Sequence, residues 1–379
     1  MSGDAIPEIP EPDRIEGAPH PRDTRHLIGQ DHAEAGFLDA YAADRLHHAW
    51  LLTGPLGVGK ATLAWRLARF LLATPEADGG GLFGDAPPAP TTLDIPDDHP
   101  VARRIHAGSE GRLYLLRRAW DEDKKRLKTV ITVDEVRKLR NFLHLSSTDG
   151  GRRAVIVDPA DEMNVSAANA LLKMLEEPPQ GVVFLLVSHR PSGLLPTIRS
   201  RCRELRLITL SPADLGRAIA AAGIDHGDGA ALAALAGGSV GEAIRLLNLD
   251  GIETYRDLVT LFATLPRLDR GRALKLADAM GQRGQAEKLE LLLTLFDLFL
   301  ARLARAGMLG FAGAEAAPGE AELFARLAPS PDAARSWAGL HQSLGARARH
   351  ARAVNLDPAA LVLDMILKVD ETARATAFA

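Results

Sequence analysis

Cysteine is almost absent from this chain of 379 residues, where Cys202 stands alone. A single cysteine excludes an internal disulfide and any zinc site built from cysteines. Disulfides are typical of exported proteins, so this scarcity favours a reducing compartment, and we expect a cytoplasmic protein. Residues 1–20 also lack the apolar core of an export signal.

The chain has no excess of charge of either sign. It carries 45 basic and 49 acidic residues, a net charge of -4, so contact with nucleic acid would need a local basic patch. The candidate patch comprises Lys124, Lys125, Arg126, Lys128, Arg137 and Lys138. A solvated surface is the alternative interpretation of these residues.

Long apolar segments are also missing. The longest, Leu289 to Leu303, is interrupted by Glu290, Thr294 and Asp297, which is typical of an amphipathic helix and too polar for a membrane span. We therefore expect no membrane contact.

Short uninterrupted apolar runs are present, and they predict strands buried on both faces of a parallel sheet. These runs are Ala49 to Leu52, Ala154 to Val157 and Val182 to Val187. Helical periodicity between them predicts a doubly wound α/β domain up to about Leu207, and from Ser211 onward the pattern is helical. Residues 74–100, rich in Gly, Pro and Asp, predict a surface excursion, with regular structure resuming near Val130.

The chain is thus predicted to have a tail followed by three domains. These parts are a disordered, acidic, proline-rich tail at 1–20, an α/β domain at 21–208, a small helical domain at 209–250 and an all-helical domain at 251–379.

A phosphate-binding loop is predicted between the first strand and the next helix. Residues 54–60 read GPLGVGK and fit the pattern G-x-x-x-x-G-K, whose backbone N–H groups hold phosphates while the lysine contacts the terminal ones. The candidate nucleotide-binding residues here are Gly54, Gly57, Gly59 and Lys60, and the candidate ligand is ATP or ADP. A glycine-rich turn that only packs closely is the alternative.

Two parts of the hydrolytic apparatus are missing around this loop. Ala61 stands where a Ser or Thr hydroxyl binds Mg²⁺, and Thr62 comes one place too late, turned by about 100 degrees on a helix. Asp158 ends the second apolar run, but Pro159 stands where a general base is expected. Asp161 lies nearby and suits a helix cap equally well. We expect no hydrolysis by this chain.

Several stretches resemble the AAA+ clamp-loader family of bacterial DNA polymerase III. They read LIGQ at 27–30, LHHAWLLTG at 46–54, ITVDEV at 131–136, AANALLKMLEEPP at 167–179 and LPTIRSRC at 195–202. The resemblance implies an α/β AAA+ domain with a P-loop and parallel sheet, then a small helical lid domain and an all-α collar domain.

The resemblance also implies roles for individual residues. In the motif Ser200, Arg201 and Cys202, the family delivers an arginine finger into the ATP site of an adjacent subunit, where it stabilises the charge that develops during hydrolysis. The alternative is that Arg199, Arg201 and Arg203 form the solvated face of a strand. Ser188 occupies a sensor position. No zinc is expected, because the family's four-cysteine module is absent.

The resulting hypothesis is a clamp-loader subunit that does not hydrolyse ATP. It would be an accessory of a DNA-directed DNA polymerase that helps load a sliding clamp onto primed DNA. The implied partners are ATPase subunits of the gamma/tau type and a delta-type subunit, with the clamp and DNA contacted through the complex. One alternative is an autonomous AAA+ ATPase in which Thr62 and Asp161 replace the missing groups. Another is a DNA-binding module outside replication.

Overall fold

The computed structural model describes residues 10–74, 90–144, 151–225, 227–310, 313–354 and 356–377. The chain forms two compact units. The first runs to Ile224 and includes Gly238–Gly241, and the second comprises Asp225–Gly237 and Glu242–Ala379.

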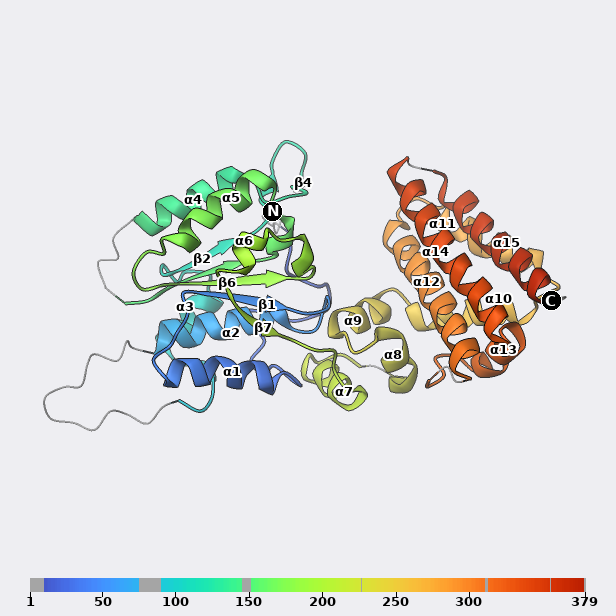
Figure 1. The fold of residues 1–379 in the computed structure, drawn as a ribbon, viewed down its shortest axis with the longest axis horizontal. Helices are drawn as coiled ribbons and strands as arrows, with labels where there is room; N and C mark the ends of the chain where they lie inside the picture. The colour runs from blue at the N-terminus through green and yellow to red at the C-terminus, as the bar shows by residue number, and fades with distance from the viewer. Residues whose placement is uncertain are drawn as a thin grey trace, which may run out of the picture. The chain divides into compact units, whose positions relative to one another are not determined.

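The first unit is built on a five-stranded parallel sheet (Figure 1). In spatial order its strands are β2 (Leu113–Leu116), β5 (Arg153–Val157), β6 (Val182–Ser188), β1 (Ala49–Thr53) and β7 (Arg203–Arg206). The three predicted strands are confirmed as the inner strands β1, β5 and β6. The edge strands β2 and β7 were not predicted, because each has only four residues and β7 is mostly charged.

Helices cover both faces of this sheet (Figure 1). On one face lie α1 (Asp31–Ala42), α2 (Lys60–Ala73) and α3 (Pro100–His106), and on the other lie α4 (Val133–His144) and α5 (Val165–Glu176). Successive strand residues point to opposite faces, so Leu51 joins the core beneath α4 and α5 while Trp50 contacts Phe37 of α1. Burial on both sides explains the uninterrupted apolar runs within the inner strands, which are polar only at one end, at Thr53, Arg153 and Ser188.

Regular structure begins earlier than predicted. The expectation of order from near Val130 is wrong, since α3 and β2 precede it, as does an antiparallel pair, β3 (Trp120–Asp121) with β4 (Arg126–Leu127). A capping box precedes α4, in which the backbone N–H of Thr132 donates to the carboxylate of Glu135 over 3.1 Å. Shorter turns follow β5 and β6: η1 (Ala160–Glu162), η2 (Pro191–Gly193) and α6 (Pro196–Arg199). Of the predicted excursion, residues 75–89 lie outside the described part.

The described part of the predicted tail is folded. Residues 1–9 lie outside the described residues, but Asp13 and His20 are buried and take part in ion pairs. The prediction of disorder is therefore wrong for residues 10–20. It failed because the acidic residues that suggested disorder find basic partners far along the chain.

Small helices follow the sheet. They are α7 (Pro212–Ala221), α8 (Gly229–Ala236) and α9 (Val240–Asn248). α7 belongs to the first compact unit and α8 to the second, and the predicted lid domain at 209–250 stays a prediction.

The second unit is helical, as predicted from Ser211 onward. It contains α10 (Gly251–Ala263), α11 (Arg270–Met280), α12 (Ala286–Leu309), α13 (Glu320–Leu327), α14 (Pro331–Ala353) and α15 (Pro358–Ala377). Its core includes the rings of Tyr255, Phe262, Phe296, Phe299 and Phe324, with centroids of contacting pairs 5.0 to 6.3 Å apart. Among the described residues, no helix combines the length and apolar character that crossing a membrane requires.

Candidate functional site

The loop at residues 54–60 joins β1 to α2 and has the backbone of a phosphate-binding loop. Gly54, Gly57 and Gly59 all have positive φ angles, of 139°, 74° and 101°, which only glycine adopts without strain. A Cβ at Gly54 would lie 2.5 Å from the carbonyl oxygen of Leu207, closer than atoms can pack. The glycines are therefore required by the fold of this loop.

Lys60, the first residue of α2, is buried beside the loop. Its ammonium donates hydrogen bonds to the carbonyl oxygens of Gly54, at 2.8 Å, and of Pro55. Burial lowers the pKa of Lys60 to about 8, and the carboxylates of Asp158 and Asp161 oppose that shift. This places a cation at the position where the pattern requires one.

Asp158 follows β5 and lies beside β2, since its N–H donates to the carbonyl oxygen of Leu116 over 3.0 Å. Its side chain is in an unfavourable place for a charge, because the residue is only 8% exposed. Burial, followed by the negative charge of Asp13, raises the pKa of Asp158 to about 7. Asp158 is thus partly protonated at neutral pH and a poor ligand for a cation.

The residues do not fit a bound Mg²⁺. Ala61 has no side-chain oxygen to offer and Asp158 carries only part of its charge at neutral pH, while Asp13 supplies negative charge from a different segment. Among the residues that the structure describes, no group of three or more His, Cys, Asp or Glu side chains is arranged to hold a metal ion.

Asp161, in the turn η1, is held by the segment that follows β6. It accepts hydrogen bonds from the hydroxyl of Ser188 at 2.5 Å and from the backbone N–H groups of His189 and Arg190 at 2.5 and 2.9 Å. Three donors therefore hold this carboxylate, which connects the turn after β5 to the end of β6.

The segment at the start of α9 closes over the phosphate-binding loop. The hydroxyl of Ser239 donates to the carbonyl oxygen of Leu56 over 2.9 Å, and the N–H of Gly241 donates to that of Gly57 over 3.1 Å. A Cβ at Gly57 would lie 2.3 Å from the Ser239 hydroxyl.

Arg201 lies in the turn between α6 and β7 and is 36% exposed. Its guanidinium donates to the carbonyl oxygen of Thr197 over 3.0 Å and pairs with the carboxylate of Glu176 at 2.7 Å. Of the alternating arginines, only Arg203 lies in a strand, where it sits over the ring of Trp50 at 5.1 Å. The alternative of a solvated strand face is therefore wrong for Arg201.

The sheet separates Arg201 from the phosphate-binding loop. β1 and β7 are parallel, with Trp50 opposite Arg203, so the loop follows the carboxyl end of β1 while Arg201 precedes the amino end of β7. β1 has five residues, which at about 3.3 Å each span about 16 Å. The structure brings Gly54 to Thr62, Asp158 and Ser188 to the edge of the sheet that is formed by the carboxyl ends of its strands. Arg201 and its neighbours Ser200 and Cys202 lie at the opposite edge, which is formed by the amino ends of the strands.

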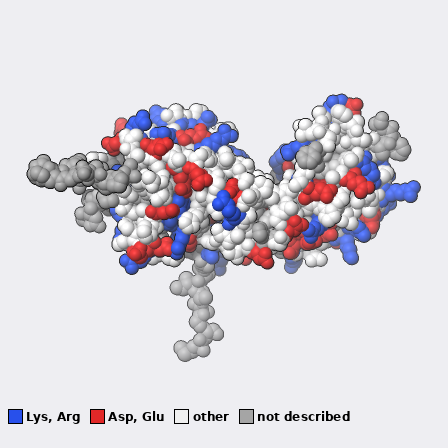
Figure 2. Space-filling view, turned by 90° about the horizontal axis from the view of Figure 1, so that it is seen from below, with Lys and Arg blue, Asp and Glu red and all other residues white. Residues whose placement is uncertain are grey.

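The predicted basic patch is partly neutralised. Lys124 lies 4.0 Å from Asp121, Lys128 lies 3.2 Å from Glu135, and Arg137 lies 2.7 Å from Asp134. On the face drawn in Figure 2, basic and acidic side chains are interspersed over both units.

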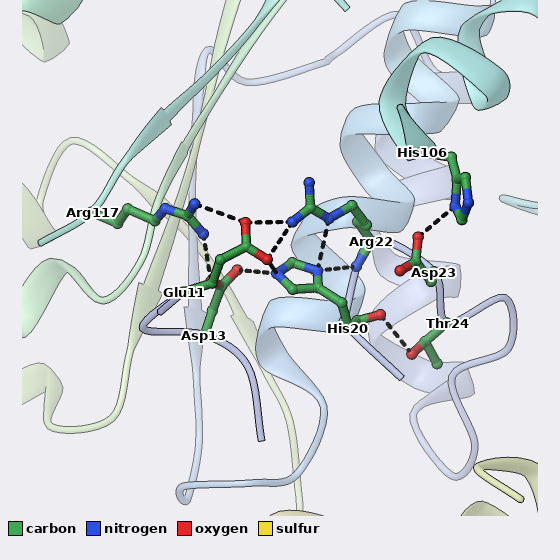
Figure 3. A network of polar contacts seen from close by, with 8 residues as sticks. All are labelled: Glu11, Asp13, His20, Arg22, Asp23, Thr24, His106 and Arg117. Carbon is green, nitrogen blue, oxygen red and sulfur yellow. Dashed lines mark hydrogen bonds and ion pairs between the residues drawn. The ribbon is translucent and has the colours of Figure 1, made fainter. Parts of the chain in front are cut away.

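Sequence reasoning missed the residues that surround Asp158 from the N-terminal side. Glu11, Asp13, His20 and Arg22 form a network with Arg117, which follows β2 (Figure 3). No local pattern signals it, because Glu11 and Arg117 are 106 positions apart.

A parallel sheet with a phosphate-binding loop after β1, an acid after β5 and a hydroxyl at the end of β6 defines a P-loop α/β domain. The predicted fold class is confirmed. Residues 29–211, slightly less than half of the chain, match the model of the family described as "DNA polymerase III, delta subunit".

Known relatives agree with this match. DNA polymerase III subunit delta' of Pseudomonas aeruginosa is 40% identical over 155 residues, which are 41% of this chain and 41% of that one. The subunit delta' of Escherichia coli is 30% identical over 59% of this chain and 61% of its own length. The subunit gamma/tau of Mycobacterium tuberculosis is 31% identical over 51% of this chain and 30% of its own length. The matched regions thus cover between 30% and 61% of these relatives, and the resemblance found in the sequence is confirmed over that part.

Proposed function

We propose that this chain is a delta'-type clamp-loader subunit that does not hydrolyse ATP and lends Arg201 to the phosphate site of a neighbouring ATPase subunit. The observation that carries the proposal is the position of Arg201 at the edge of the sheet opposite its own phosphate-binding loop. From there its guanidinium does not reach that loop, whereas a partner subunit that docks on this edge receives it directly.

The side chain is suited to this task. A guanidinium is always charged and presents several N–H donors in one plane, which match the oxygens of a transferring phosphoryl group. A hydrogen bond to the carbonyl oxygen of Thr197 and an ion pair with the carboxylate of Glu176 hold it at the surface. Ordering the side chain in advance reduces the entropy that is lost when it engages a phosphate.

The absence of hydrolysis is proposed from the chemistry beside the chain's own loop. Ala61 offers no ligand to Mg²⁺, the pKa of Asp158 is raised to about 7, and Pro159 orients no water. ATP or ADP without a metal remains the ligand class that the loop and Lys60 suit.

The proposed partners follow from the relatives. A gamma/tau-type subunit would supply the ATP site that Arg201 enters, and a delta-type subunit would complete the assembly in the cytoplasm. The sliding clamp and primed DNA would be handled by the whole complex.

Reconstitution tests this proposal. The chain and its Arg201→Ala variant are assembled with gamma/tau-type and delta-type subunits, and DNA-stimulated ATPase and clamp loading are measured. We expect normal assembly on gel filtration and a loss of ATPase rate in the variant that approaches the factor of about 10³ associated with arginine fingers. Arg199→Ala, which removes an exposed arginine from the neighbouring turn, is the matched control and should leave the rate unchanged. Full activity of the Arg201→Ala complex would overturn the proposal.

The autonomous ATPase is the second candidate and has a simple test. Steady-state ATP hydrolysis by the purified chain, abolished by Lys60→Ala, would favour it. We expect no turnover above background, because Asp161, one of the residues it requires, is held by three hydrogen-bond donors.

A further inference from the structure

Residues 10–22, here named the N-terminal strap, lie at the carboxyl ends of β2 and β5. Arg117 follows β2, and the residue before it, Leu116, accepts the backbone hydrogen bond of Asp158. The strap pairs with Arg117 through Asp13 at 2.7 Å and through Glu11 at 2.9 Å (Figure 3). These contacts place the strap next to the acidic residue of the nucleotide site.

The strap is also held against α2. His20 contacts the ring of Trp65 with centroids 5.7 Å apart, and Arg69 donates to the carbonyl oxygen of Arg22. The His20 ring lies 3.2 Å from Glu11 and 3.3 Å from Asp13. Its imidazole therefore joins the acidic end of the strap to the helix that begins with Lys60.

A third contact reaches the cover of the phosphate-binding loop. Ile15 lies 3.1 Å from the position that a Cβ on Gly241 would take, and the Cα of Gly57 lies 3.0 Å from the same point. Gly241 is thus enclosed between the strap and the loop, so that a shift of the strap changes the packing over the loop.

Asp13 is the residue of the strap whose charge lies next to the nucleotide site. Its side chain is only 5% exposed. Burial opposes ionisation, but the hydrogen bond from His20 and the charge of Arg117 outweigh it and lower the pKa of Asp13 to about 2. Asp13 is therefore ionised at neutral pH, and its charge acts on Asp158, whose pKa it helps to raise.

We propose that the strap is an autoinhibitory segment that closes the metal side of the nucleotide site through Asp13 and Arg117. With the strap docked, like charge repels nucleotide phosphates and the basic group that faces them, Arg117, is already neutralised by Glu11 and Asp13. Release of the strap frees Arg117 and removes the repelling carboxylate, so the loop then binds nucleotide. This goes beyond the proposed role of Arg201 and is independent of it.

Nucleotide binding by the full-length chain tests the strap. The paired variant Glu11→Gln with Asp13→Asn keeps the size of both side chains and removes their charges. Fluorescence titration with mant-ATP, with and without Mg²⁺, is expected to show affinity at least about tenfold higher in this variant than in the unmodified chain. The gain should vanish when Lys60→Ala is added, which places the binding at the loop.

Asp23→Asn is the matched control, because Asp23 is an acid just beyond the strap that pairs with His106 at 2.6 Å. It should bind nucleotide like the unmodified chain. Equal affinity of the paired variant and the unmodified chain, with hydrogen exchange showing that residues 10–22 have been released, would overturn the proposal.

A second measurement needs no variant and decides the matter if the paired variant does not fold. Hydrogen exchange of residues 10–22 in the unmodified chain is compared without nucleotide and at millimolar ADP or ATP. Faster exchange of the strap on binding is expected, and binding that leaves its protection intact would show that the strap does not close the site.

Discussion

The carboxylate of Glu176, the last residue of α5, lies 2.7 Å from the guanidinium of Arg201. α5 packs on the sheet, whereas Arg201 belongs to the turn before β7, so the pair joins two elements at the edge proposed to meet an ATPase. Both side chains remain partly exposed, at 41% and 36%. A guanidinium has five N–H donors, so Arg201 can keep its pairing with Glu176 and still contact a phosphate.

Removing this partner should weaken the proposed finger without abolishing it. An exposed ion pair is worth about 0 to 1 kcal/mol, so Glu176→Ala is expected to lower the neighbour's ATPase kcat by up to about fivefold with KM unchanged. Glu176→Gln, which retains a hydrogen-bond acceptor, should recover part of the loss. A rate equal to that of the unmodified complex, measured where Arg201→Ala is inactive, would show that Glu176 has no positioning role.

Asp161 is expected to be structural. Asp161→Ala leaves the Ser188 hydroxyl and the N–H groups of His189 and Arg190 without their acceptor, and the loss of hydrogen bonds to a charged group should destabilise the first unit by about 2 to 4 kcal/mol. Urea denaturation followed by circular dichroism measures this. Unchanged stability together with loss of an ATPase activity would instead support Asp161 as a catalytic base.

The second unit contains a buried ionic network. Glu320 is fully buried and accepts hydrogen bonds from Tyr255, from the N–H of Ala316 and, at 2.8 Å, from Arg302. Glu320→Ala leaves the charge of Arg302 buried without its partner, and we expect a loss of about 3 to 5 kcal/mol in the free energy of unfolding.

The matched control for this network is Glu322→Ala, which removes an exposed acid from the same helix, α13. Its free energy of unfolding, measured in urea, should stay within about 0.5 kcal/mol of that of the unmodified chain. If the two variants unfold alike, the network does not stabilise this unit.

Cys202 should be inert towards thiol reagents. Burial raises the pKa of its thiol to about 12, so the reactive thiolate is scarce at pH 8 and its fraction grows only as the pH approaches 12. Reaction with Ellman's reagent is expected to be slow in the native protein and rapid in denaturant. Fast native labelling at pH 8 would contradict this, with the denatured chain as the reference for full accessibility.

Local sequence was sufficient for the elements whose pattern is complete within a few residues. β1, β5 and β6 each contain an uninterrupted apolar run because both faces of the sheet are covered. The glycine pattern before Lys60 marks a loop whose φ angles only glycine adopts without strain. The losses at Ala61 and Pro159 are also visible in the sequence, since each concerns the identity of one residue.

Only the tertiary structure determined those features that depend on contacts between segments far apart in the sequence. Because β7 pairs with β1 in parallel, Arg201 and the phosphate-binding loop lie at opposite edges of one sheet, and no spacing in the sequence reveals this. The acidic N-terminal residues are typical of a disordered tail, yet they are ordered by Arg117 and by the ring of Trp65. The raised pKa of Asp158 arises in the same way, because burial and the charge of Asp13 act through space and appear only when the chain has folded.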